Sequence, residues 1–203
     1  MNKLIFTLSL IFSLNSFAQE NKYEPVANKA EYYAVKYLPG KNYMDFRNWV
    51  MENQEKVLNK TDVYDNFDIA LFQPQFGTDL TQFDAVFLGL WPNATEMFAG
   101  MEYWAKNGGE QNAKVPVKTV QAVDTWQWAV SAPEGDPDIG VVRFSDCKMK
   151  DGVNANQVFD ALKDFAIAAK ETGDNLGRKM IFPGSGGTAV SYTHLTLPTI
   201  SRV

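Results

Sequence analysis

Three residues of one expected strand combine an acid with two indoles. Within residues 117–131 (VKTVQAVDTWQWAVS), Asp124, Trp126 and Trp128 are spaced two apart. Side chains two apart in a strand point to the same face, so the three would lie together. A carboxyl group held among indoles in an apolar pocket has a raised pKa and can act as a general base. The alternative is that the indoles pack in the core and the acid faces water at a bend.

Arg143 lies in a second strand-like run, residues 139–147 (IGVVRFSDC). If its face lines a cavity, the guanidinium could bind an anionic ligand, and the alternative is an ion pair at the surface or between domains. The sequence therefore predicts a ligand-binding set of Asp124, Trp126, Trp128 and Arg143, with no catalytic residue assigned.

Thiol and metal chemistry receive little support. Cys147 is the only cysteine, so it has no disulfide partner in this chain, and we interpret it as a small packed side chain. The only histidine, His194, lies in a terminal segment of doubtful origin, which leaves the thiol without a base. The acids closest to Cys147 in the sequence are Asp136, Asp138, Asp146 and Asp151. Their spacing is not that of a calcium-binding loop, so we predict no metal site.

Both ends of the chain have special character. Residues 1–18 (MNKLIFTLSLIFSLNSFA) have one Lys, an apolar run and a small-residue cleavage site, which is typical of a bacterial secretory signal peptide. Residues 19–30 are polar and aperiodic and are expected to form a leader. Residues 190–199 (VSYTHLTLPT) resemble a translated sequencing adapter, so we expect residues 190–203 to be non-native and the natural protein to continue. A Thr-rich terminal strand is the alternative. The expected location is periplasmic or secreted.

The composition is that of a folded, acidic protein. The 203 residues are 45% hydrophobic and 13% aromatic, which argues against a disordered or disulfide-dense chain. The formal net charge of −5, with no basic cluster, argues against a nucleic acid partner. No apolar run beyond the signal peptide is long enough to cross a bilayer.

The pattern of elements predicts one complete α+β unit over residues 31–131. Strand-like runs are separated by two amphipathic helices, the second beginning with a cap at Asn93. The expected order is β-α-β-β-α-β, which is the ferredoxin-like order. The expected elements are strands 31–39, 67–74, 83–92 and 117–131, and helices 43–58 and 93–107.

The same pattern then begins again. Residues 132–138 (APEGDPD) form a turn-rich boundary, and a second unit is expected over 139–189, truncated after its first half. It contains a strand at 139–147, a helix at 154–172 and a strand at 177–183. Val158, Leu162, Phe165 and Ala169 define the expected apolar face of that helix.

Two such units in tandem resemble the dimeric α+β barrel superfamily, which includes antibiotic-monooxygenase-like and stress-responsive barrel proteins. The resemblance rests on element order and turn placement over residues 31–131 and 139–189. It implies two sheets that face each other around a cavity. Members include cofactor-free oxygenases, haem-handling enzymes and binding modules. Haem members with a histidine ligand need a residue that this chain lacks before residue 190, so we predict no cofactor.

These observations favour an exported module that binds a small apolar molecule or another protein. One alternative is a cofactor-independent, monooxygenase-like enzyme acting on an apolar or phenolic substrate, with Asp124, Trp126, Trp128 and Arg143 lining its pocket. Another alternative is a structural envelope protein. We expect the two units to pair within the chain and to span no membrane after signal cleavage, and a homo-oligomer remains open.

Overall fold

The structure is a computed structural model that describes residues 28–77, 79–133, 140–186 and 192–197. The predicted signal peptide, most of the leader and the boundary residues 134–138 lie outside the described residues. Among the helices that are described, none combines the length and apolar character needed to cross a bilayer.

The first unit has the predicted β-α-β-β-α-β order. Its strands form an antiparallel array in the order β2-β3-β1-β4, as in ferredoxin-like folds. β1 begins three residues earlier than expected, inside the predicted leader. The elements are β1 (Asn28–Tyr37), α1 (Tyr43–Lys56), the 3-10 turns η1 (Leu58–Lys60) and η2 (Asp62–Tyr64), β2 (Asp68–Phe72), β3 (Ala85–Trp91), α2 (Ala94–Asn107), the short α3 (Gly109–Asn112) and β4 (Val117–Ser131).

Asparagine side chains set where the long helices begin. The Asn42 side chain accepts hydrogen bonds from the first-turn amides of α1, and the Asp45 carboxylate accepts one from the Asn42 backbone amide. The predicted cap at Asn93 is confirmed, since its Oδ1 accepts from the Glu96 amide at 3.0 Å. Each bond satisfies a backbone donor that has no partner within the helix, so these positions start helices reproducibly.

The second unit repeats the first half of this topology. It consists of β5 (Arg143–Cys147), α4 (Ala155–Glu171), β6 (Gly177–Pro183) and β7 (Tyr192–Leu197). Its strands lie in the order β6-β7-β5, which corresponds to β2-β3-β1 of the first unit. β7 falls within the residues predicted to be non-native, and it pairs with both β5 and β6. The non-native origin of that segment stays a prediction.

One long strand joins the two units. The first part of β4 pairs with β1, and its last part, residues 125–131, pairs with β6. Irregularities at Ala34/Val35 and Ala129/Ser131 interrupt these ladders, and such bulges bend and twist a strand. The sheet curls so that side chains of its two edge strands contact each other, because the Phe144 ring on β5 lies 6.4 Å from the Phe72 ring on β2 between centroids. The result is the predicted barrel of two facing half-sheets.

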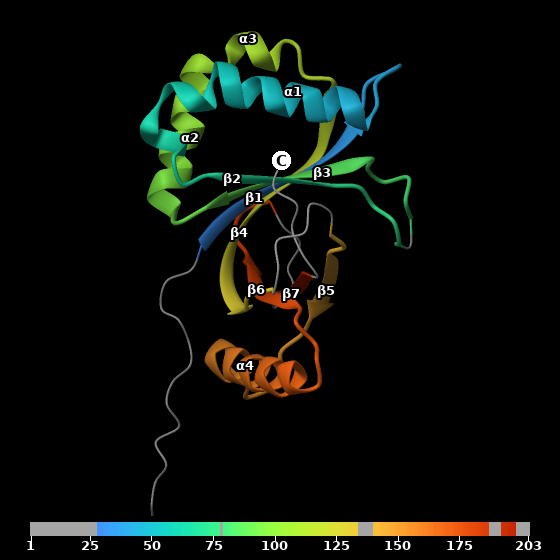
Figure 1. The fold of residues 1–203 in the computed structure, drawn as a ribbon, viewed down its shortest axis with the longest axis vertical. Coiled ribbons are helices and arrows are strands. Elements are labelled where there is room, and N and C mark those ends of the chain that lie inside the picture. The colour runs from blue at the N-terminus through green and yellow to red at the C-terminus, as the bar shows by residue number, and fades with distance from the viewer. Residues whose placement is uncertain (1–27, 78, 134–139, 187–191, 198–203) are drawn as a thin grey trace, which may run out of the picture.

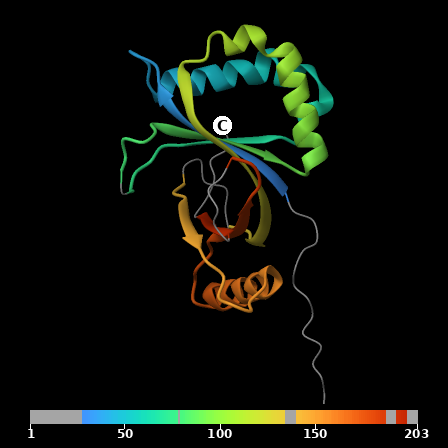
Figure 2. The same ribbon diagram turned by 180° about the vertical axis from the view of Figure 1, so that it is seen from behind.

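The helices cover the outside of this barrel. α1, α2 and α3 lie over the first half-sheet, and α4 lies over the second at the opposite end of the molecule (Figures 1 and 2). The apolar face of α4 differs from the prediction, because Phe165 is 55% exposed. The buried face is formed instead by Phe159 and Ala166, with Val158 and Leu162 beside them.

Candidate functional site

The predicted acid and its neighbouring indole lie on the outer face of β4, not inside the barrel. Asp124 stands opposite Glu31 in the ladder, and Trp126 stands opposite Lys29. The Lys29 ammonium lies 3.1 Å from Asp124 Oδ2 and 4.3 Å from the centroid of the Trp126 ring. Asp124 Oδ1 also accepts a bond from the Ser185 amide at 2.7 Å. These contacts give Asp124 a structural task, which is to pair a buried lysine and to hold the segment after β6.

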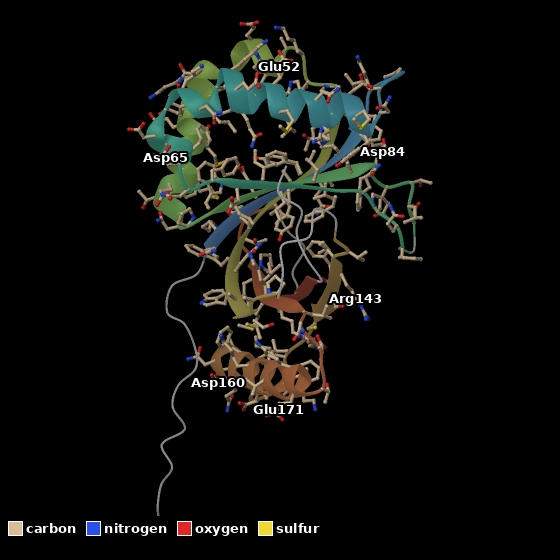
Figure 3. The ribbon with its side chains drawn as sticks, viewed as in Figure 1. Glu52, Asp65, Asp84, Arg143, Asp160 and Glu171 are labelled. Carbon is tan, nitrogen blue, oxygen red and sulfur yellow. The ribbon has the colours of Figure 1, made fainter. Side chains whose placement is uncertain are left out.

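The other two predicted residues lie elsewhere on the same outer surface. Trp128 packs edge-on against Phe182 at 5.4 Å between centroids, next to the core beneath α4. Arg143 is exposed on β5, which β6 and β7 separate from β4 (Figure 3). Phe144 points into the barrel, so its neighbour Arg143 points outward. The structure thus brings Asp124 and Trp126 together through Lys29, whereas Trp128 and Arg143 lie apart from them. The predicted role of the four residues in ligand binding stays a prediction.

Inside the barrel, polar side chains bond to one another. Gln127 Nε2 donates to Tyr32 Oη at 2.7 Å, and Lys179 Nζ donates to Gln127 Oε1 at 3.3 Å. Burial lowers the pKa of the Lys179 ammonium below its ordinary value, and nearby Asp68 opposes the shift. Tyr32, Gln127 and Lys179 thus bond to one another, and these hydrogen bonds satisfy polar groups buried between the two half-sheets.

A cavity of about 360 Å³ lies between the helices and the sheet of the first unit. β1, β2, β3 and the start of β4 form its floor, α1 forms its roof and α2 closes one side. Aromatic side chains make up much of the wall. The lining residues are Glu31, Tyr33, Val35, Phe46, Trp49, Val50, Asn53, Leu58, Tyr64, Phe67, Ile69, Phe87, Trp91, Gly100, Met101, Trp104, Asn112, Val115, Val117 and Thr119.

Glu31 is the buried acid of this cavity. Its Oε1 accepts a hydrogen bond from Trp91 Nε1 at 3.1 Å, and its Oε2 accepts one from Tyr33 Oη at 2.8 Å. The residue is 9% exposed. Burial raises the pKa of the Glu31 carboxyl above its ordinary value, while the bonds from Tyr33 and Trp91 act in the opposite direction. A carboxyl group with these surroundings can accept or release a proton closer to neutral pH than an exposed one.

Two glycines make room for this arrangement. Gly89 stands opposite Glu31 on β3, and a Cβ there would lie 2.9 Å from Glu31 Oε1. Gly100 on α2 faces the Trp91 ring, where a Cβ would lie 2.1 Å from a ring carbon. The absence of side chains at these two positions lets Glu31 and Trp91 occupy the space between helix and sheet.

The aromatic wall beside Glu31 is itself well packed. The rings of Phe67 and Trp91 lie 4.1 Å apart between centroids, and Tyr64 lies 5.5 Å from Trp91. Tyr64 Oη donates to the Gly100 carbonyl at 2.6 Å. Burial and the nearby Glu31 carboxylate raise the pKa of Tyr64 to about 12, so the phenol keeps its proton at neutral pH.

Asn53 supplies a second polar group on the roof of the cavity. It is 4% exposed on α1, and its Oδ1 has no hydrogen-bond partner among the described residues. An unpaired buried acceptor is unfavourable, so a donor at this position would be stabilised. Among the described residues of the lining there is no Lys, Arg or His, and Glu31 is the one readily charged side chain among them.

Glu31 and Asn53 were not among the sequence-predicted site residues. Glu31 shares its strand face with Tyr33 and Val35, so an acid in an otherwise apolar series was the available signal. Asn53 is likewise a polar residue in an otherwise apolar series, because it shares the buried face of α1 with Phe46 and Val50. In the part of the chain that the structure describes, no three His, Cys, Asp or Glu side chains cluster closely enough to hold a metal ion.

Comparisons with known proteins do not assign the chain to a family. No protein-family model matches the chain, and no curated protein matches it. A solved structure named "Putative Chlorite dismutase TA0507" is similar, with a TM-score of 0.46 and 11% sequence identity. The similarity covers 84% of this chain and 78% of that chain. Because the likeness is this distant, it says nothing about activity.

Proposed function

We propose that this protein is an exported binding module that holds one small, largely aromatic molecule in the cavity of its first unit. The observation that carries the proposal is the cavity of about 360 Å³, lined by aromatic rings, with the buried Glu31 carboxyl at its floor. Small-molecule sites are commonly about 300–1,000 Å³, mostly apolar, with a few polar groups that orient the ligand. The signal-peptide pattern of residues 1–18 supports export.

Binding is favoured over catalysis by what surrounds Glu31. A nucleophile with an adjacent base would indicate covalent chemistry. The described lining has no Ser, Cys or Lys, and burial raises the pKa of Tyr33, the hydroxyl beside Glu31, so this phenol keeps its proton at neutral pH. The oxygenase alternative placed its pocket at Asp124, Trp126, Trp128 and Arg143, which lie on the outer surface. A purely structural role needs no cavity of this size, so the structure favours it less.

Ligand-induced stabilisation tests the proposal directly. Trp49, Trp91 and Trp104 line the cavity, so an aromatic ligand should change tryptophan fluorescence and raise the melting temperature. A panel of naphthalene, indole, phenol and 2-phenylethanol would provide the probes. We expect at least one probe to stabilise the protein with a dissociation constant in the micromolar to millimolar range.

A cavity-filling variant supplies the control. Val50 lines the roof and is buried, so Val50→Phe would occupy part of the space, while Ile167→Phe adds the same ring on the exposed surface of α4. Binding should be weakened in the first variant and unchanged in the second. If no probe stabilises the wild-type protein, or if a folded Val50→Phe variant binds equally well, the cavity is not a binding site.

A further inference from the structure

The indole donors that line the cavity already have partners. Trp49 Nε1 donates to the Gln111 carbonyl at 3.0 Å, and Trp104 Nε1 donates to Asn112 Oδ1 at 3.1 Å. The indole of Trp91 is bonded to Glu31 as described above. An indole has a single donor and no acceptor, so none of these three rings can donate to a ligand without losing its present bond.

The two phenols that line the cavity are engaged in the same way. Tyr33 Oη donates to Glu31 Oε2, and Tyr64 Oη donates to the Gly100 carbonyl. A ligand that relied on accepting hydrogen bonds would therefore have to displace an existing bond from one of these rings. Such displacement is unfavourable because it leaves a buried group unpaired.

Two groups of the lining keep free capacity to accept hydrogen bonds. Each Glu31 oxygen accepts one bond, yet a carboxylate has about four acceptor positions in all. Asn53 Oδ1 has no partner among the described residues. Glu31 belongs to the floor on β1 and Asn53 to the roof on α1, so the two acceptors line the same cavity from opposite walls.

The charge of the lining also favours a ligand that donates hydrogen bonds and carries positive charge. The lining residues that the structure describes have one carboxyl group and no basic side chain, so a bound anion would meet like charge and no compensation. A cation would instead be paired with Glu31 and would contact the faces of aromatic rings, which attract positive charge. The chain as a whole is acidic, with a formal net charge of −5, and therefore also attracts cations.

We propose that the ligand is a small aromatic amine whose ammonium donates to Glu31 and Asn53 while its ring packs against the aromatic wall. An ammonium has three donors and no acceptor, which matches the hydrogen-bonding capacity left in the cavity. This inference rests on the proposed function and specifies the chemical class of the ligand.

Three probes of nearly equal size separate the possibilities: 2-phenylethylamine, 2-phenylethanol and phenylacetate. Calorimetry on the full chain at pH 8 should show the amine binding about tenfold or more tightly than the alcohol, with no measurable binding of the acid. Glu31→Gln keeps the size of the side chain and removes its charge. It should reduce amine affinity to the level of the alcohol and change alcohol affinity by less than about threefold. Because alcohol binding persists, it confirms that the variant is folded.

Two further variants complete the design. Glu102→Gln removes a carboxylate from the exposed surface of α2 and should leave all three affinities unchanged. Asn53→Ala should weaken the amine more than the alcohol. If the alcohol binds as tightly as the amine, or if Glu31→Gln keeps the preference, the amine inference is wrong although the cavity binds ligands. If neither these probes nor the aromatic panel binds the wild type, the proposed function itself fails.

Discussion

Replacement of Gly100 by alanine tests the contact between α2 and Trp91 on which the cavity depends. The new Cβ would lie 2.1 Å from one carbon of the Trp91 ring and within 2.9 Å of two others. The ring cannot easily move away. Its Nε1 is bonded to Glu31, and its face lies 4.1 Å from Phe67 between centroids.

Two opposing effects determine how much Gly100→Ala changes the free energy of unfolding. Alanine in place of glycine inside a helix stabilises by about 1 kcal/mol, because it loses less backbone entropy on folding. An extra carbon forced into a packed core costs about 1–3 kcal/mol. A 2.1 Å contact lies far inside the van der Waals minimum, so the upper part of that range applies. We expect Gly100→Ala to lower the free energy of unfolding by about 1–2 kcal/mol in sum.

Urea unfolding at pH 7, followed by far-ultraviolet circular dichroism, measures this difference. Gly109→Ala is the matched control, because nothing lies within 4 Å of a Cβ at the start of α3. That variant should be as stable as the wild type or slightly more stable. A Gly100→Ala protein with unchanged or increased stability and an unchanged m-value would refute the close approach of α2 to Trp91.

Three further predictions concern charge and core packing. Because burial raises the pKa of Glu31 in the folded state, the free energy of unfolding should fall as pH rises from the ordinary value of 4.5 through the folded-state pKa. Glu31→Gln should abolish that fall in urea titrations between pH 4 and 8. Asp124→Asn leaves Lys29, which is 3% exposed, without its carboxylate and should cost about 3 kcal/mol, and Lys29→Met in the same chain should recover much of this loss in chemical denaturation. Phe159→Ala should destabilise by about 3–5 kcal/mol in thermal unfolding, whereas Ile167→Ala should change stability by less than about 0.5 kcal/mol, and equal effects would contradict the orientation of α4.

The order of elements could be predicted from the sequence because its signals are local. Apolar alternation marked β1, a continuous apolar run marked β3, spacings of three and four residues marked α4, and the cap at Asn93 marked the start of α2. Each signal spans only a few residues and depends on backbone geometry that every strand or helix shares. The face of α4 was predicted less well, because Phe165 fits the helical period yet lies beyond the width of the buried stripe.

The position of the candidate site depended on which side of a strand faces which layer. The spacing of Asp124 and Trp126 correctly placed them on one face, but the same spacing is compatible with an inward or an outward orientation. Pairing with β1 determined the orientation of this face, because it placed Asp124 opposite Glu31 and Trp126 opposite Lys29. Only the tertiary structure could show that this face lies outside the barrel.

The sequence by itself determined the types of element, their βαββαβ order and the repetition of the first half of that order. The tertiary structure alone decided that Glu31 meets Trp91, which lies 60 residues away, and that Asn53 shares a cavity with them. The physical reason is the range of the interactions. Helix and strand patterns follow from contacts within a few residues, whereas a buried acid and its donor are brought together by strand pairing and helix packing across the whole unit.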